Sequence, residues 1–212
     1  MTGFGGAGLI RKFFKRHHLE KKIEQQVQIP GRRQCKYSIG TMLMSLLYGM
    51  FLGYSRPGQM GVLATDSVFI KIVGWLCFPV QSTMSRFLSG LRVAVAQQIA
   101  LLNFSLLMQF RQGFRVFQAL TLDLDSHVTS VFGRQQRAAV GYNPKKKGRK
   151  SYHTLLCFIG ETRDYLGGLF RSGNHHTSYQ AVLFLKRILE KLPGHLKKIC
   201  LRADSGFSVW SF

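Results

Sequence analysis

The chain has 212 residues, with 30 Lys and Arg against 9 Asp and Glu, and a formal net charge of +21. Because 46% of its residues are hydrophobic and 12% are aromatic, the composition excludes a disordered tail and predicts a buried core. The excess of positive charge predicts a polyanionic partner, with nucleic acid first and an anionic membrane surface second.

The four cysteines stand singly in the sequence, at Cys35, Cys77, Cys157 and Cys200. Without a C-x-x-C pair they indicate neither a zinc site nor a disulfide framework, and reduced thiols in the cytoplasm are expected. The first ten residues are rich in glycine and precede the basic residues, which is the reverse of a secretory signal. The apolar run over residues 38–55 is shorter than a membrane span of about 20 residues, so a soluble protein without a membrane partner is expected.

The first half of the chain reads as helical. The sequence predicts a basic helix over residues 9–27, an apolar helix over residues 41–54 and a long apolar helix over residues 92–112. Residues 67–76 and 80–88 are predicted to be two short helices joined by a turn at Pro79, which is typical of a helix-turn-helix near residues 67–89.

The second of these short helices has a polar first half that faces away from Met84, Phe87 and Leu88. Its side chains are of the kinds that contact base edges and phosphates, and the candidate DNA-binding residues are Gln81, Ser82, Thr83, Ser85 and Arg86. Many helical hairpins share this pattern, and it is the net charge that favours DNA binding.

Two acids lie in one strand-like run. Over residues 116–125 leucines alternate with polar residues, which places Asp123 and Asp125 on one face at the C-terminal end of the predicted strand. A second strand, residues 198–203, leads directly to Asp204. Two strands that each deliver a carboxylate at the same edge predict a divalent metal site. For each aspartate alone, capping of the next turn is the alternative.

A basic loop follows the first strand. Between residues 134 and 150 there are seven cations and no acid, and Pro144 and Gly148 mark the segment as a loop. A solvated loop is the alternative, but clustering of like charges favours contacts with phosphates. The candidate phosphate contacts are Arg134, Arg137, Lys145, Lys146, Lys147, Arg149 and Lys150.

The order of predicted elements after residue 113 is strand, strand, strand, helix, strand. This order is typical of an α/β protein with a ribonuclease-H-like core, in which the first and fourth strands are parallel neighbours. Asp125 and Asp204 would then face each other. The predicted organisation is a helical DNA-binding region over residues 1–112 and the N-terminal part of a ribonuclease-H-like core over residues 113–212.

Several short motifs occur in order along the chain: Leu122-Asp123-Leu124-Asp125-Ser126, Gly141-Tyr142-Asn143-Pro144-Lys145-Lys146, Gly148-Arg149, Ser151-Tyr152-His153, Arg171-Ser172-Gly173-Asn174, His176-Thr177 and Leu201-Arg202-Ala203-Asp204-Ser205-Gly206-Phe207. Together they resemble bacterial insertion-sequence transposases of the DDE type. Residues 79–88 are similar to the stretch that precedes the catalytic core of these transposases. The resemblance covers residues 75–207.

The resemblance implies a cut-and-paste transposase. Its helical region would bind the terminal inverted repeats of double-stranded DNA, and its core would cleave and join DNA with two Mg²⁺ ions held by three carboxylates. The first carboxylate carries over to Asp125, with Asp123 as the second choice, and the second carries over to Asp204. Arg202 is expected to make a contact on the sheet surface.

The third carboxylate of the family, a glutamate in a Tyr-Arg-Glu-Lys-type signature, has no counterpart before Phe212. Glu161 is expected in a turn and Glu190 in a helix, so neither is an evident substitute. We therefore expect a C-terminally truncated core that is inactive alone. The alternative is a non-catalytic DNA-binding module that competes with an intact transposase. A basic membrane-surface protein is disfavoured by the two aspartates on strands, and a homodimer is compatible with either of the first two interpretations.

Overall fold

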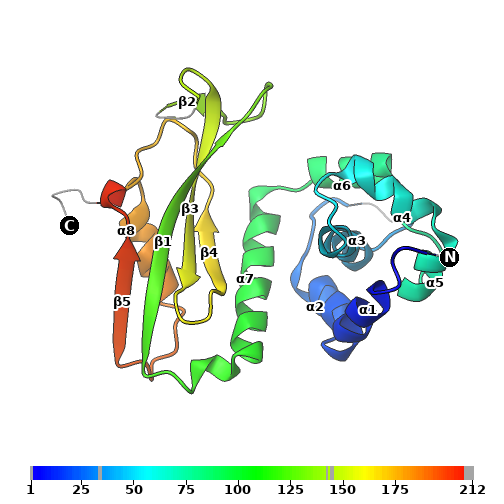
Figure 1. Ribbon diagram of the computed structural model, residues 1–212, viewed down its shortest axis with the longest axis horizontal. Coiled ribbons are helices and arrows are strands. Elements are labelled where there is room, and N and C mark those ends of the chain that lie inside the picture. Colours follow the sequence, from blue (N-terminus) through cyan, green and yellow to red (C-terminus); the bar gives the residue numbers. More distant parts are fainter. Residues whose placement is uncertain (1, 33–34, 142, 144–145, 208–212) are drawn as a thin grey trace. The chain divides into compact units, whose positions relative to one another are not determined.

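The computed structural model describes residues 2–32, 35–141, 143 and 146–207. The chain forms two compact units, Met1–Asn103 and Phe104–Phe212, and the division falls inside helix α7 (Val93–Phe110). Helices build the first unit, here called the helical unit, and a mixed sheet with a helix builds the second, the sheet unit (Figure 1). The chain is therefore an α/β protein, as predicted.

Among its described residues, the helical unit contains six α-helices before α7: α1 (Ala7–Arg16), α2 (Leu19–Gln26), α3 (Ile39–Phe51), α4 (Gly61–Thr65), α5 (Ser67–Val73) and α6 (Gln81–Ser89). The prediction of one helix over residues 9–27 was wrong. His18 lies between α1 and α2 in the left-handed conformation, with φ 50°, and an L-residue in that conformation interrupts a right-handed helix. The predicted pair of short helices is present as α5 and α6.

Aromatic side chains form the centre of the helical unit. The Tyr48 ring lies edge-on to Phe14 and to Phe69, with 5.2 and 6.0 Å between the ring centroids. The centroids of Phe69 and Phe78 are 5.6 Å apart. Such edge-to-face pairs add to the stability that burial of the rings provides. Asp66 caps α5 by accepting a hydrogen bond from the Phe69 N–H at 2.8 Å.

Within the described residues, α7 is the one helix long and apolar enough to cross a membrane by length and composition. Its last turns belong to the sheet unit, where Phe104, Leu107 and Met108 pack against the buried core. A helix packed in this way against a protein core gives the same composition.

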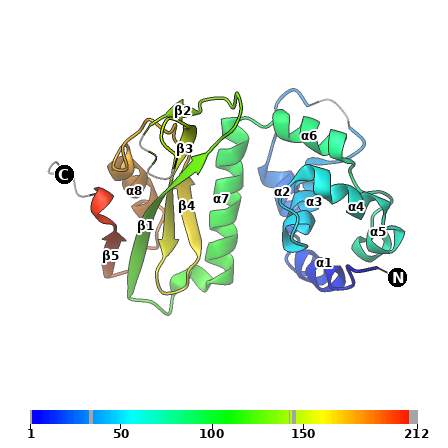
Figure 2. The same cartoon turned by 45° about the horizontal axis from the view of Figure 1, so that its top comes forward.

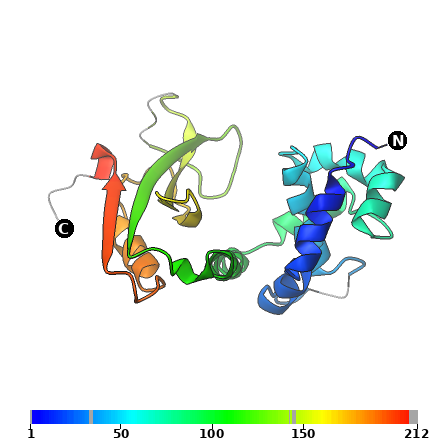
Figure 3. The ribbon, with the colours of Figure 1, turned by 60° about the horizontal axis from the view of Figure 1, so that its bottom comes forward.

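The described part of the sheet unit contains five strands: β1 (Ala119–Ser130), β2 (Ala139–Val140), β3 (Lys150–Ile159), β4 (Tyr165–Leu169) and β5 (Lys198–Ala203). β3 pairs antiparallel with β1, β2 and β4, and β1 pairs parallel with β5. Helix α8 (Ala181–Leu189) joins β4 to β5 and lies against one face of the sheet (Figures 2 and 3). The parallel neighbours expected from the sequence, the first and last strands, are therefore present.

β1 is longer than predicted. The expectation that the strand begins at residue 116 and that Asp125 ends it was wrong, because β1 runs from Ala119 to Ser130. Antiparallel pairing with β3 continues from Asp125 opposite Leu156 to Ser130 opposite Ser151. Backbone hydrogen bonding extends the strand where the alternation of apolar residues has already ended.

The core of the sheet unit lies between the sheet and α8. Leu120, Leu122 and Leu124 of β1 are buried against Phe184 and Ile188 of α8. The opposite face of β1 carries Thr121, Asp123 and Asp125, as the period of two requires. The alternation therefore determines which face of the sheet carries the acids.

Candidate functional site

Asp125 and Asp204 lie at the point where β1 and β5 separate. The parallel register pairs Asp123 with Arg202 and Leu124 with Ala203, so Asp125 and Asp204 each stand one residue beyond the last pair. Neighbouring strands are about 4.8 Å apart, and both carboxylates are exposed. Figure 1 shows the two strands side by side with their arrows in the same direction. The topology therefore brings these two acids together at the C-terminal end of β5, beside the middle of β1.

A short turn fixes Asp204. Its Oδ1 accepts a hydrogen bond from the Gly206 N–H at 3.0 Å. Phe207, three residues after Asp204, is buried in the core of the sheet unit. A Cβ atom on Gly206 would lie 3.1 Å from Asp204 Oδ1 and 3.3 Å from Thr177 Cγ2. The turn therefore packs closely against the loop that contains Thr177.

Asp123 has a different partner. Its Oδ1 and Oδ2 each accept a hydrogen bond at 2.6 Å from the Arg202 guanidinium, from Nε and Nη2 respectively. The Arg202 side chain is 70% exposed and that of Asp123 is 29% exposed, so solvent screens the attraction between the two charges. Arg202 therefore makes the contact on the sheet surface that was expected, and it engages both carboxylate oxygens of Asp123.

Arg171 organises the loop beside Asp204. Its side chain is only 3% exposed. Nε donates to the His153 carbonyl at 2.9 Å, and Nη1 donates to the carbonyls of His176, Thr177 and Tyr179 at 3.3, 2.8 and 2.7 Å. Burial lowers the pKa of the guanidinium. One buried cation therefore shapes residues 172–180 through backbone carbonyls.

His153 supports the same loop from β3. Its Nδ1 lies 2.9 Å from the His175 carbonyl oxygen. Because a carbonyl only accepts, Nδ1 carries the proton. Burial lowers the pKa of His153, and the nearby Arg171 and His176 lower it further, whereas Asp204 acts in the opposite direction. A neutral imidazole is thus favoured beside the aspartate.

The other two acids considered from the sequence do not join Asp125 and Asp204. Glu161 lies in the turn after β3, and its carboxylate accepts the Thr121 N–H at 2.8 and 3.0 Å. Thr121 is four residues before Asp125, or about 13 Å along the strand. Glu190 is exposed at the end of α8. Over the described part of the chain, no group of three or more His, Cys, Asp or Glu is arranged to hold a metal ion.

The basic loop lies between the C-terminal end of β1 and the N-terminal end of β3. Its cations are exposed wherever they are described: Arg134, Arg137, Lys146, Lys147, Arg149 and Lys150. Lys145 lies outside the described residues. Asn143 is buried and holds the loop to β1, since its Nδ2 donates to Ser130 Oγ at 2.9 Å and its Oδ1 accepts the Lys146 N–H at 3.0 Å.

The polar side chains predicted on α6 face solvent. Gln81, Ser82, Ser85 and Arg86 are exposed, and Thr83 is half-buried, while Met84 is buried. A cavity of about 690 Å³ opens beside this helix. Its lining includes the cations Arg32, Lys36, Arg86 and Arg92.

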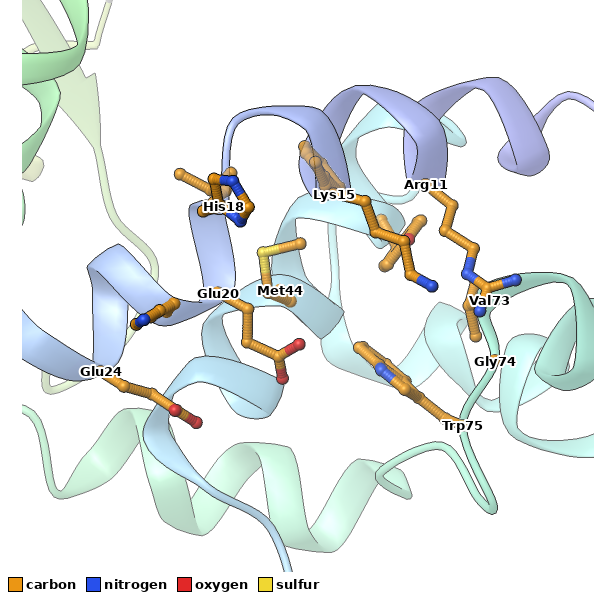
Figure 4. A pocket seen from close by; sticks show the side chains of 13 residues that line it. Arg11, Lys15, His18, Glu20, Glu24, Met44, Val73, Gly74 and Trp75 are labelled. Atoms are coloured by element: carbon orange, nitrogen blue, oxygen red, sulfur yellow. The ribbon is translucent and has the colours of Figure 1, made fainter.

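A second cavity, of about 430 Å³, lies in the helical unit (Figure 4). Arg11 and Lys15 approach it from α1, Glu20 and Glu24 from α2, and Trp75 from the segment after α5. Neither Asp125 nor Asp204 lines this cavity. Its charges are mixed, which suits neither a polyanion nor a metal ion alone.

The whole chain, residues 1–212, matches the family model described as transposase DDE domain group 1. The chain belongs to this transposase family. Its role is therefore in DNA transposition, and DNA is its partner. No curated protein matches the chain, and no solved structure does either.

DDE transposases generally work with a divalent metal, and the acids of this transposase chain suit one. Mg²⁺ is usually held by one or two carboxylates together with waters and substrate phosphates. Asp125 and Asp204 supply two exposed carboxylates at adjacent strand positions. Asp123 has both oxygens hydrogen-bonded to Arg202, so Asp125 and Asp204 fit a metal ion better than Asp123 does.

Sequence reasoning missed the residues that support this transposase site. Arg171 appeared only as part of a motif, and His153 carried no role. Because both act by hydrogen bonds to backbone carbonyls of residues 175–179, no periodicity in the sequence marks them. The one signal for Arg171 was an arginine at the end of a predicted strand, directly before a Ser-Gly pair.

Proposed function

We propose that this chain binds the terminal inverted repeats of double-stranded DNA and that Asp125 and Asp204 hold Mg²⁺ at a ribonuclease-H-like core, the part that in the transposase family cleaves and joins DNA. Family membership supports the role in transposition. The parallel pairing of β1 with β5, which ends one residue before both acids, is the observation that carries the assignment of the two carboxylates.

The proposed DNA contacts lie on two surfaces. In the helical unit, the exposed side of α6 and the cations around the neighbouring cavity would contact base edges and phosphates. In the sheet unit, the basic loop would contact phosphates. Because the loop contains no acid between residues 134 and 150, its charges find no neutralising partner within the loop itself.

Each residue of the site has a distinct task in this proposal. Asp125 and Asp204 would hold the metal, which when bound activates a hydroxyl nucleophile and stabilises the leaving oxygen of phosphoryl transfer. Arg171 positions the loop over residues 172–180 against the turn that carries Asp204. Arg202 neutralises Asp123, which lowers the negative charge that approaching DNA meets.

The metal assignment is tested with Mn²⁺ as a spectroscopic probe for Mg²⁺. Binding is measured by electron paramagnetic resonance on the full chain with a terminal-repeat duplex present. We expect Asp125→Asn and Asp204→Asn each to weaken binding at least tenfold. Asp123→Asn is the matched control, since it removes one carboxylate from the same face of β1 and should change binding less than twofold. Equal losses in all three variants would contradict the assignment.

The same duplex tests the chemistry. Mg²⁺-dependent nicking that is lost in Asp125→Asn and Asp204→Asn would establish that the chain cleaves DNA. Binding of the duplex without nicking, unaffected by the two variants, would instead support the non-catalytic DNA-binding module. Absence of duplex binding by the wild-type chain would refute the proposal. A cytoplasmic location, where chromosomal DNA of a bacterium lies, belongs to this proposal.

A further inference from the structure

Phe132 is an exposed aromatic residue two positions before the basic loop of residues 134–150. It lies two residues after the end of β1, and its side chain is 68% exposed. A single exposed apolar side chain is ordinary on a protein surface and needs no explanation by itself. The surroundings of Phe132 are what distinguish it.

Two cations approach this ring. Lys146 Nζ lies 4.6 Å from the ring centroid and Arg149 Cζ lies 5.4 Å from it. Both are within the distance of a cation–π interaction. Lys146 and Arg149 are themselves exposed, so their charges are accessible to a ligand.

The fold holds this arrangement from two directions. The Val131 N–H donates to the Lys150 carbonyl at 2.9 Å, which ties the segment before Phe132 to the start of β3. Asn143 bonds Ser130 Oγ and the Lys146 N–H at once. Residues separated by more than ten positions in the sequence are therefore brought to one place by backbone and amide hydrogen bonds.

The chemistry of the three side chains selects the ligand. An exposed ring offers a surface on which a base can stack, and two adjacent cations offer partners for its phosphates. In duplex DNA the faces of the bases are already covered by their neighbours, so a base face is free only where a strand is unpaired. A phosphate-only contact would not need the ring.

We propose that Phe132, Lys146 and Arg149 form a site for an unpaired nucleotide of DNA, whose base stacks on Phe132. The inference rests on the proposed DNA-binding function and deepens it, because it distinguishes an unpaired end or single strand from the duplex. Phe132 then adds base stacking to the phosphate contacts of the basic loop.

Three DNA probes test the site with the full chain. They are a fluorescent single strand of about 12 nucleotides, the same strand with its bases replaced by abasic residues, and the blunt duplex of the same sequence. Affinities are measured by fluorescence anisotropy at one salt concentration. Phe132→Ala should weaken binding of the intact single strand about tenfold, which is within the range for loss of one base–aromatic stack.

The same variant should change binding of the abasic strand and of the duplex less than twofold. Phe132→Trp keeps a stacking surface and should bind the single strand as the wild type does. Phe51→Ala is the control, because it removes a ring that is 63% exposed in α3 of the helical unit. Changing both Lys146 and Arg149 to Ala should weaken all three probes and flatten the salt dependence.

Unchanged affinity of Phe132→Ala for the intact strand would overturn the stacking site. Equal weakening for the intact and abasic strands would overturn it as well, since the ring would then act on the backbone or the loop conformation. If the duplex binds normally in these cases, the proposed DNA-binding function survives and only the nucleotide site is lost. If the wild type binds no probe, both fail.

Discussion

Replacement of Arg171 by methionine should loosen the loop of residues 172–180 beside Asp204. Arg171→Met keeps an unbranched chain of similar length but removes all four donated hydrogen bonds, to His153, His176, Thr177 and Tyr179. The carbonyls on residues 176–179 would then lose the partner that brings them together. Arg171→Lys should be intermediate, because an ammonium group donates fewer hydrogen bonds in a different geometry.

The expected loss follows from opposing contributions. A hydrogen bond from a charged donor contributes about 1.5–3 kcal/mol net. Arg171 donates to four carbonyls, but the three contacts of Nη1 share two hydrogens, and the longest of them is 3.3 Å. Against this stands the cost of burying the cation, evident in the lowered pKa of Arg171 and in Nη2, which is buried without a hydrogen-bond partner. We expect the balance to be about 3 kcal/mol of opening free energy for the loop, within the range for breaking a buried charged network.

Hydrogen–deuterium exchange measured by mass spectrometry reads this loss locally. An opening free energy lower by about 3 kcal/mol corresponds to exchange about a hundredfold faster for the protected amides of residues 173–181. Arg187→Met is the matched control, because it removes the same charge from an exposed position on α8. Unchanged exchange in Arg171→Met, or equal acceleration in Arg187→Met, would show that the buried guanidinium does not hold the loop.

Three further predictions concern the sheet unit and one thiol of the helical unit. Gly173→Ala should lower the thermal midpoint in circular dichroism, because its Cβ would lie 2.7 Å from the Ala139 carbonyl oxygen, whereas Gly194→Ala, with open space around it, should not. The pKa of His153 is lowered in the folded chain, so the unfolded chain takes up a proton near pH 6.5 and the folded chain only at lower pH. The free energy of unfolding measured with urea should therefore fall as the pH drops below about 6.5. The same pH dependence of that free energy in His153→Gln as in the wild type would contradict this. Burial raises the pKa of Cys157 to about 12, and the Tyr37 hydroxyl lowers that of Cys77 by hydrogen bonding to its sulfur. Iodoacetamide should therefore modify Cys77 in the native chain and reach Cys157 only in denaturant, as peptide mass spectrometry would show.

The alternation of leucines with polar residues around Asp123 and Asp125 could be recognised in the sequence, because it depends only on residues that are neighbours along the chain. Leucines at every second position predicted a strand with one buried face, and β1 has that face against α8. The order of strands and the helix predicted that the first and last strands would be parallel neighbours, and the pairing of β1 with β5 confirms it. The position of Asp125 within β1 was mistaken, because the strand is extended by pairing with β3 and not by its own pattern.

By itself the sequence determined the alternating faces, the basic loop and the likeness to DDE transposases, because each of these is written in local composition and spacing. The tertiary structure alone decided which charges meet. It paired Asp123 with Arg202, buried Arg171 under the carbonyls of a loop, and brought Lys146 and Arg149 to Phe132. These contacts depend on the register of strands and on hydrogen bonds between distant segments, and a periodic pattern in the chain carries no information about either.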